Sequence, residues 1–281
     1  MRQNSSSCNF STSDNWVILS NIEQSIKRKI ESIGTPLKEW DIQINYGIKT
    51  GFNDAFIIST EKRNEILNNC TSEEERKKTD ELIRPILRGR DIKRYGYDWA
   101  NLWLINTHNG IKEKNISRIN VEKDYPAIKK HLDKYWDKLE KRADQGDTPY
   151  NLRNCAYMDD FNKPKIMYSE IVQSPQFFFD EKNNFFPEAT TFILTGNNLR
   201  YLCNLFNTNF IAWVFKRFYA GGGLGENGYR YKKAFFEKLP IPIYIGSSIQ
   251  IGIEKNVKNI DLKVYELYGL SDEEIAYIES I

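Results

Sequence analysis

The sequence is poor in the residues from which metal sites and disulfide frameworks are built. It has two histidines, His108 and His131, and its four cysteines lie far apart, with none in a CxxC pair. Zinc sites need closely spaced Cys and His ligands, so no zinc site is expected. Scattered, unpaired cysteines are typical of reduced thiols, and we therefore expect a cytoplasmic protein.

Long hydrophobic runs and a strong net charge are also missing. The longest apolar run, Phe210–Phe215, is far too short to cross a bilayer, and no signal peptide is recognised, so a soluble chain without a membrane partner is expected. The net charge is only +2. Overall basicity therefore gives no indication of nucleic-acid binding, and any such argument depends on where the charges lie.

Complete catalytic motifs are absent as well. Neither the P-loop pattern nor the Asn-Pro-Pro-Tyr and Asp-Pro-Pro-Tyr signatures of adenine-amino methyltransferases occur. Residues 221–228 contain a literal GxGxxG, but a helix rather than a strand is expected before it, which argues against a dinucleotide fold. Residues 180–182 have the ExK spacing of a nuclease site without its Pro-Asp partner, and they read as a hairpin turn. We expect no catalytic, cofactor-binding or metal-binding residue in this chain.

Apolar and aromatic residues are plentiful, at 40% and 14% of the 281 residues. Such a composition indicates a folded chain with a full core. An alternating pattern predicts a strand at Trp40–Tyr46, and the apolar segment Trp99–Ile105 predicts a buried strand. Helical patterns predict helices at Thr71–Leu82 and Val121–Ala143. We expect an α+β fold of mixed β-sheets with flanking helices, arranged in two lobes, with a helical C-terminal part.

The polar segment Asp144–Tyr150 is the clearest break in the pattern of predicted helices and strands. It contains Gly146 and Pro149 between charged residues, which is typical of a loop or hinge. We expect it to divide an N-terminal α+β lobe, residues 1–146, from a C-terminal β-rich lobe with terminal helices, residues 147–281.

Positive charge is concentrated in the stretch Ile83–Tyr97. Five basic residues accompany one acid, Asp91, and Pro85 and Gly89 interrupt any long helix. We expect the basic groups on a loop between a helix and a strand. Guanidinium groups on such a loop suit phosphate oxygens or a guanine edge. The alternatives are a solvated charged turn and, for Asp91, a buried position from which it orients the arginines.

Two glycine-containing segments have related features. Gly47–Ile58 brackets a Lys-Thr pair with two glycines, which predicts exposed backbone amides suited to phosphate. Its alternative is a tight turn between strands. Ala220–Tyr231 is a glycine loop with basic and aromatic neighbours, which lets a nucleic acid approach closely. Its alternative is a flexible surface loop whose tyrosines pack on its own base.

Several pieces of the sequence together resemble one family. The pieces are Trp40–Ile42 leading into Gly47–Phe56, Ile83–Tyr95 with its Arg88-Gly89-Arg90-Asp91-Ile92 centre, Lys163–Ile166, Leu239–Pro242, and the closing Asp261–Glu274 run. In this order they are similar to the TaqI-like C-terminal specificity domain, the target-recognition domain of type IIG restriction-modification enzymes and adenine-N6 DNA methyltransferases. The resemblance covers nearly the whole chain.

The resemblance implies a DNA-binding module of a phage-defence enzyme that is not catalytic on its own. Such a module reads a short sequence in double-stranded DNA and positions the target adenine for a methyltransferase domain of the same parent polypeptide. S-adenosylmethionine, and Mg²⁺ if the parent also cleaves DNA, are then expected in the parent enzyme and not in this chain. The alternative function is a protein-interaction module of a phage-defence complex.

The family supplies no motif for base-reading residues, so the candidate contacts come from local charge and loop chemistry. The expected phosphate contacts are Arg88, Arg90, Lys93, Arg94, Arg230 and Lys232, with Lys49, Thr50 and Asn53 as a second group. The expected base-edge contacts are Arg90, Asn227, Tyr229 and Arg230.

Overall fold

The described chain forms two compact units. The computed structural model describes residues 19–221, 228–243 and 257–281, so Asn227, a predicted base contact, lies outside the described residues. Unit 1 is drawn from residues 1–42, 170–177 and 196–281, and unit 2 comprises residues 43–169 and 178–195. Each unit is described separately below.

The two units are divided differently from the predicted lobes 1–146 and 147–281. Residues 144–150, the predicted hinge, lie inside unit 2. The buried guanidinium of Arg142 donates hydrogen bonds to the main-chain oxygens of Asp144, at 2.8 Å, and Pro149, at 3.0 Å. These bonds hold the segment to the unit. The polar, Gly- and Pro-containing composition therefore marks an anchored loop at this place.

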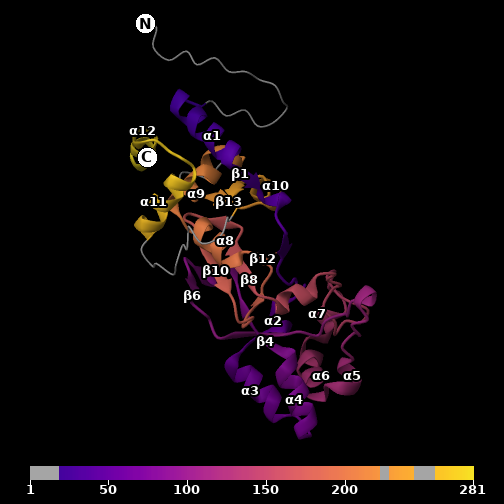
Figure 1. Cartoon of the computed structure of the whole chain (residues 1–281). Helices are drawn as coiled ribbons and strands as arrows, with labels where there is room; N and C mark the ends of the chain where they lie inside the picture. The colour runs from indigo at the N-terminus through magenta and orange to yellow at the C-terminus, as the bar shows by residue number, and fades with distance from the viewer. Residues whose placement is uncertain (1–18, 222–227, 244–256) are drawn as a thin grey trace. The chain divides into compact units, whose positions relative to one another are not determined.

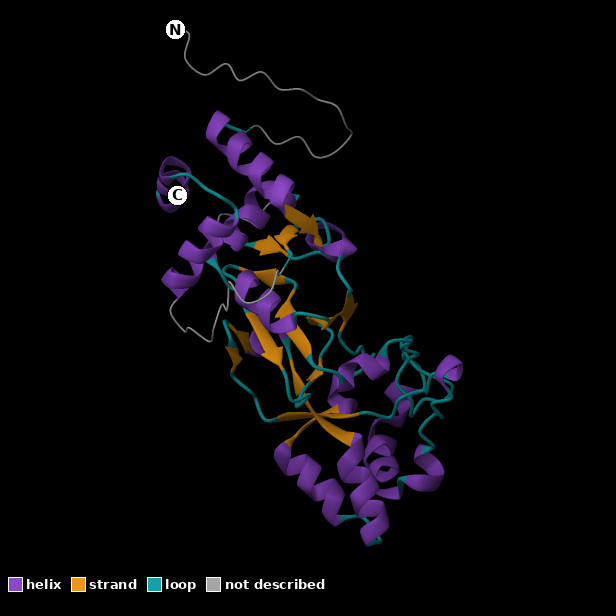
Figure 2. Cartoon of the chain, in the orientation of Figure 1, coloured by secondary structure: helices purple, strands orange, loops and turns teal. Residues whose placement is uncertain are grey.

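Unit 2 is built on two four-stranded sheets, whose strands form separate groups in Figure 2. The strands of the first sheet, in spatial order, are β10 (Phe177–Asp180), β8 (Lys165–Ser169), β12 (Thr191–Gly196) and β2 (Ile42–Tyr46). Those of the second are β11 (Phe186–Pro187), β4 (Ile83–Leu87), β7 (Leu102–Ile105) and β3 (Ile57–Ser59). The second sheet is mixed, because β7 is antiparallel to β3 and β4, whereas β11 runs parallel to β4.

Helices α3, α4, α5 and α6 gather on one side of the second sheet (Figure 1). The helical segments of unit 2 are α2 (Asn53–Phe56), α3 (Thr60–Asn68), α4 (Glu73–Leu82), α5 (Val121–Asp124), α6 (Pro126–Leu132) and α7 (Trp136–Leu139). The predicted helix Thr71–Leu82 is confirmed as α4. The single long helix predicted over 121–143 is wrong. Pro126 starts a new helix there, because proline fits the first helical position and not a helix interior.

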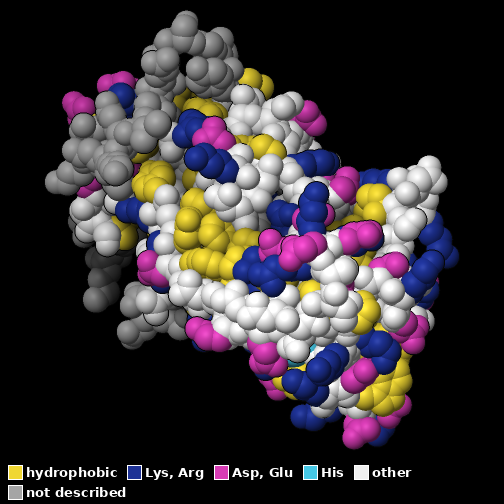
Figure 3. Space-filling model, turned by 90° about the horizontal axis from the view of Figure 1, so that it is seen from below, with side chains coloured by type: hydrophobic (Ala, Val, Ile, Leu, Met, Phe, Trp, Pro, Cys, Tyr) yellow, Lys and Arg dark blue, Asp and Glu magenta, His cyan; other side chains and the backbone are white. Residues whose placement is uncertain are grey.

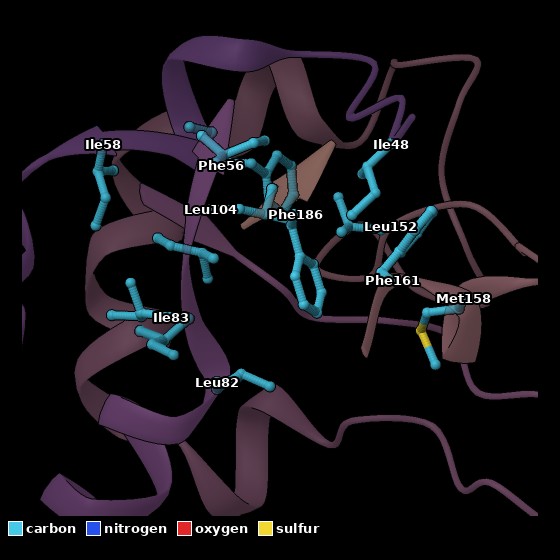
Figure 4. Close-up of a cluster of buried hydrophobic side chains, with 14 of the residues drawn as sticks. Ile48, Phe56, Ile58, Leu82, Ile83, Leu104, Leu152, Met158, Phe161 and Phe186 are labelled. Carbon is cyan, nitrogen blue, oxygen red and sulfur yellow. The ribbon is translucent and has the colours of Figure 1, made fainter. Parts of the chain in front are cut away.

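The core of unit 2 joins segments that are distant in the sequence (Figure 4). Phe56 and Leu104 are fully buried between the second sheet and its helices. Ile48, Leu152 and Phe161 belong to the same cluster, although they come from loops and a 3₁₀ turn. Burying an apolar side chain of this size contributes roughly 1.5–3 kcal/mol. The loops around residues 48, 152 and 161 are thereby anchored to the core.

Unit 1 is mainly helical, with short paired strands. Its helices are α1 (Asn21–Ile33), α8 (Leu199–Phe206), α9 (Asn209–Val214), α10 (Lys233–Phe236), α11 (Val257–Leu267) and α12 (Asp272–Glu279). Its strand pairs are β1 (Gly34–Pro36) with β14 (Pro240–Pro242) and β9 (Ile171–Val172) with β13 (Tyr229–Arg230). Buried Glu23 of α1 accepts hydrogen bonds from Arg217, the shorter at 2.5 Å, and Lys29 of α1 pairs with Glu274 of α12 at 2.7 Å. These contacts tie the first helix to the last part of the chain.

The predicted α+β class is confirmed. The fold has mixed β-sheets with helices packed against them, and its C-terminal part consists of α11 and α12.

None of the helices in the described ranges combines the length and the hydropathy needed to cross a membrane.

Candidate nucleic-acid interface

The turn that follows β4 is organised by an arginine and an aspartate. Arg88 donates from Nε and Nη2 to the two carboxylate oxygens of Asp91, at 2.9 and 2.7 Å, and its main-chain N–H donates to the same carboxylate at 3.0 Å. Burial alone would raise the pKa of Asp91, but these hydrogen bonds outweigh it and hold the pKa below its usual value. Asp91 is 5% exposed. Of the alternatives open for Asp91, the buried orienting position is the one observed, and the arginine that it orients is Arg88.

The same turn presents Arg90 to solvent. Gly89 donates its N–H to the Thr190 hydroxyl at 2.9 Å, and a Cβ on Gly89 would lie 2.7 Å from the Thr190 main-chain oxygen. The close approach requires glycine and fixes the turn against β12. Arg90 is exposed and follows directly. The backbone that carries this guanidinium is already ordered, so binding a phosphate costs only the freedom of the Arg90 side chain itself.

Lys93 and Arg94, the next cations of the basic stretch, are less accessible than Arg90. The Lys93 ammonium donates to the main-chain oxygen of Arg90 at 3.0 Å and lies 3.8 Å from a carboxylate oxygen of Asp98. Arg94 is half-buried. Arg90 is thus the most accessible cation of the stretch.

The turn Gly47–Asn53 is fixed by the main chain of unit 2. Gly47 donates its N–H to Thr191 at 2.8 Å, Ile48 donates to Pro187 at 2.8 Å, and a Cβ on Gly47 would overlap the main chain of Glu188. The buried Thr50 hydroxyl donates to Asn53 Oδ1 at 2.6 Å and accepts from the N–H of Phe52. Thr50 therefore holds the turn, whereas Lys49 and Asn53 are exposed.

Arg142 clamps this turn to the loop 144–151. Besides Asp144 and Pro149, it donates to the main-chain oxygens of Thr50 and Asn151. Its guanidinium lies over the Phe56 ring, 4.6 Å from the centroid. Burial lowers the pKa of Arg142 to about 10. One carbonyl oxygen of the Gly47–Asn53 turn and three of the loop 144–151 share one buried cation, so the relative placement of the turn and the loop depends on it.

A pocket of about 270 Å³ opens beside the Gly47–Lys49 turn, within unit 2. Ile48, Leu152, Met158 and Phe161 form its apolar wall and belong to the core cluster of Figure 4. Its other lining residues are Tyr46, Gly47, Lys49, Asn106, His108, Arg153, Asn154, Cys155, Ala156 and Tyr157. The pocket thus combines an apolar wall, two tyrosines and two cations.

Two polar side chains of the pocket have hydrogen-bonding groups to spare. Asn106 is 8% exposed, and its amide makes no hydrogen bond within the described part of the chain. The N–H of Gly110 donates to His108 Nδ1 at 3.2 Å, so the neutral ring carries its proton on Nε2. Burial lowers the pKa of His108 and keeps that ring neutral near pH 7. An amide and an imidazole N–H are therefore available to a ligand.

The basic and aromatic residues of unit 1 divide between surface and core. Lys232 is exposed at the start of α10, and Arg230 is half-buried in β13. Tyr229 is 2% exposed, and its ring lies 5.2 Å from that of Tyr231 and 6.2 Å from that of Phe215, measured between centroids. A base edge cannot reach the Tyr229 ring in this conformation. The packing matches the alternative reading, in which the tyrosines lie against the base of the loop.

Charge on the surface is mixed in sign. On the face shown in Figure 3, Lys and Arg side chains are interleaved with Asp and Glu side chains. The predicted cations Lys49 and Arg90 both belong to unit 2, and Arg230 and Lys232 belong to unit 1. Within the ranges that the structure describes, no group of three His, Cys, Asp or Glu side chains is placed to hold a metal ion.

Sequence reasoning did not identify the residues that share the pocket with Lys49. Asn106 and His108 directly follow the buried strand β7, in the polar run Asn-Thr-His-Asn-Gly. A polar run at the end of a buried strand is a signal that could have found them. Arg153, Asn154 and Tyr157 are brought in by the Arg142 clamp and by the hydrogen bond from the Leu152 N–H to Thr107, at 2.9 Å. No local sequence pattern carries that information.

Two solved structures have a fold similar to that of this chain. Type IIL restriction-modification enzyme MmeI, whose structure was determined in complex with DNA, matches 87% of this chain with 13% identity and a TM-score of 0.58. Type IIG restriction endonuclease BpuSI matches 93% of this chain with 15% identity and a TM-score of 0.56. The match spans only 35% and 32% of those two proteins. The chain therefore corresponds in fold to about a third of each.

The family profile of the TaqI-like C-terminal specificity domain matches residues 84–241. This range covers more than half of the chain and includes the Arg88–Asp91 turn, the Arg142 clamp, most of the residues of the pocket and the β9–β13 pair. The chain belongs to the family of TaqI-like C-terminal specificity domains.

Proposed function

We propose that this chain is the DNA target-recognition module of a larger restriction-modification enzyme. The observation that carries the proposal is Arg90, an exposed guanidinium on a turn fixed by the Arg88–Asp91 pair, inside the segment that the family profile matches. Such a turn supplies a cation of defined position to phosphate or to a guanine edge. The two solved structures of similar fold, a restriction-modification enzyme and a restriction endonuclease, support this class of function.

The contact set is narrower than the one predicted from sequence. It keeps Arg90, Lys93 and Lys49 of unit 2 and Arg230 and Lys232 of unit 1. Arg88 and Thr50 act through the fold, because their polar groups are bonded to Asp91 and Asn53. In the parent enzyme, a separate domain would carry S-adenosylmethionine and methylate an adenine at N6, and Mg²⁺ would serve any cleavage. Such an enzyme acts on DNA in the cytoplasm, in defence against phage.

The first test measures binding of a random 30-base-pair duplex to the 281-residue chain by fluorescence anisotropy at several salt concentrations. Each lost phosphate contact reduces the slope of log K against log salt by about one unit. Arg90→Ala and Lys49→Ala should each show that reduction. Arg118→Ala and Lys112→Ala serve as matched controls, because both cations are exposed in unit 2 and have no ion pair among the residues described.

Two outcomes would contradict the proposal at different levels. If the unmodified chain has no measurable affinity for duplex at low salt, it is not a DNA-recognition module, and a stable complex with another polypeptide would favour the protein-interaction alternative. If the chain binds DNA but Arg90→Ala behaves like Arg118→Ala, the function stands and the contact assignment is wrong.

A further inference from the structure

Apart from Lys49, the residues that line the pocket beside the Gly47 turn have no role in the DNA contacts proposed above. The pocket volume of about 270 Å³ lies near the lower end of the range of about 300–1,000 Å³ in which small-molecule sites fall. A single nucleotide is a ligand of this size class. The pocket lies wholly within unit 2 and is held by Arg142 and the main-chain bonds of the Gly47 turn.

The chemistry of the lining points to a planar heterocycle. Tyr46, which is 48% exposed, and half-buried Tyr157 supply aromatic surface at the wall, with Phe161 and Met158 below. Stacking on aromatic side chains stabilises a bound base whatever its sequence context. Ile48 completes the apolar wall. A flat, apolar-faced ligand fits these surfaces better than a sugar or a peptide.

Asn106 supplies the selective feature. Its amide makes no hydrogen bond within the described residues and is not one of the fully enclosed polar groups, so it is accessible in the pocket that it lines and free to bond a ligand there. An Asn amide accepts a hydrogen bond with its oxygen and donates with its NH₂, which matches the N6 amine and N7 of adenine in one bidentate contact. The Nε2–H of His108 adds a donor for a further ring nitrogen. Guanine presents an acceptor where adenine presents the amine, so the pair discriminates between them.

The cations of the lining suit a phosphate on the same ligand. Lys49 is exposed, and Arg153 is half exposed and lies 3.0 Å from a carboxylate oxygen of Asp144. Both line the pocket together with Asn106. Charge-assisted bonds from such groups are the usual means of holding a phosphate.

We propose that this pocket binds an unpaired adenine nucleotide, with Asn106 reading the base and Lys49 and Arg153 holding its phosphate. The nucleotide is either a free adenosine monophosphate or an adenine displaced from duplex DNA. Only the second source rests on the proposed function. The pocket becomes a second recognition site, separate from the Arg90 turn.

The test uses the 281-residue chain, isothermal titration calorimetry and three probes: adenosine 5′-monophosphate, inosine 5′-monophosphate, and a duplex with one adenine opposite an abasic site. Asn106→Leu removes the amide and keeps its approximate volume. Asn162→Leu is the matched control, because Asn162 is exposed in unit 2 and does not line the pocket. Urea unfolding of both variants separates binding from folding.

Adenosine monophosphate should bind at least about 10-fold more tightly than inosine monophosphate, the discrimination expected of one bidentate contact. Asn106→Leu should abolish that preference while its urea midpoint stays close to that of the unmodified chain, since the amide makes no hydrogen bond within the described fold that the substitution could break. If only the duplex with the unpaired adenine shows an Asn106-dependent gain over a fully paired duplex, DNA is the source of the nucleotide.

Two results would overturn the inference. One is that the folded Asn106→Leu variant binds both adenosine monophosphate and the duplex with the unpaired adenine as tightly as the unmodified chain does. The other is that Asn106→Leu lowers the urea midpoint by more than Asn162→Leu does, because the amide would then be part of the fold. In both cases, binding of the fully paired duplex and its salt slope remain an independent measure of the proposed function.

Discussion

Replacing Arg88 by alanine should damage the fold rather than a DNA contact. The substitution leaves the Asp91 carboxylate buried without its two guanidinium bonds. Breaking a buried pair by removing one partner costs about 3–5 kcal/mol. Because the Arg88 side chain is 22% exposed and partly screened by water, we expect a loss of about 2–3 kcal/mol in the free energy of unfolding at pH 7.

The loss should depend on pH in a defined direction. The folded pKa of Asp91 lies below its ordinary value of 3.8, so its contribution is fully present above pH 3.8 and is lost as the pH falls through the folded pKa. In Arg88→Ala, burial without the guanidinium should raise the pKa of Asp91 above its ordinary value. Folding of the variant then takes up protons, so a lower pH favours its folded state. The difference in the free energy of unfolding between the variant and the unmodified chain should therefore shrink between pH 7 and about pH 3.

Urea unfolding followed by circular dichroism at pH 7, 5 and 3 measures this deficit. Arg90→Ala is the internal control, since an exposed side chain away from the core should change stability by no more than about 0.5 kcal/mol. If Arg88→Ala keeps the urea midpoint of the unmodified chain and instead lowers the salt slope of DNA binding by one unit, Arg88 contacts phosphate and the reasoning fails.

Three further substitutions probe other parts of the structure. Arg142→Ala should lower the free energy of unfolding by about 3 kcal/mol or more, seen in urea melts, and should speed amide exchange in residues 144–151, because four carbonyls, two of them in buried hydrogen bonds, lose their donor. Gly47→Ala should lower the free energy of unfolding by about 1–3 kcal/mol, because its Cβ would overlap the main chain of Glu188. Gly96→Ala is the control and should lower it by less than about 1 kcal/mol, because the space around Gly96 is open. Equal urea midpoints for the two variants would contradict this packing. Glu23→Gln should cost about 2–3 kcal/mol at pH 7, because bonds from Arg217 and Ser20 outweigh burial and lower the Glu23 pKa to about 2. The cost should disappear between about pH 4.5 and pH 2 in acid titrations of unfolding, and a cost unchanged over that range would refute it.

The sequence predicted the class of fold and the elements with strong periodicity. Strand β7 lies within the apolar segment that predicted a buried strand, and helix α4 lies where the helical pattern predicted a helix. The predicted helix over 121–143 is wrong because the pattern of apolar positions continues through Pro126, whereas the backbone is interrupted there and α6 begins at the proline. The local pattern thus identified which segments are helices or strands, whereas Pro126 determined where one helix ended and the next began.

The roles of the predicted site residues depended on contacts that no local pattern reports. Arg88 and Arg90 are two residues apart and chemically alike, yet one is bonded to a buried carboxylate and the other faces solvent. The difference arises because Gly89 is fixed by Thr190, about a hundred residues later in the chain. Asn106 could not be recognised as unpartnered for the same reason, since its pocket combines segments around residues 48, 106 and 155.

The interrupted course of the chain through the two units has a consequence for synthesis on the ribosome. All of unit 2 has been translated once residue 195 is reached, whereas unit 1 also needs residues 196–281. Helix α1 is translated before all of unit 2, but it finds Arg217 and Glu274 only after about 190 to 250 further residues. Unit 2 can therefore assemble in the nascent chain while α1 still waits for its partners. Premature termination between residues 196 and 281 would leave a complete unit 2 attached to a helix with its apolar face uncovered, a form that chaperones and proteases recognise.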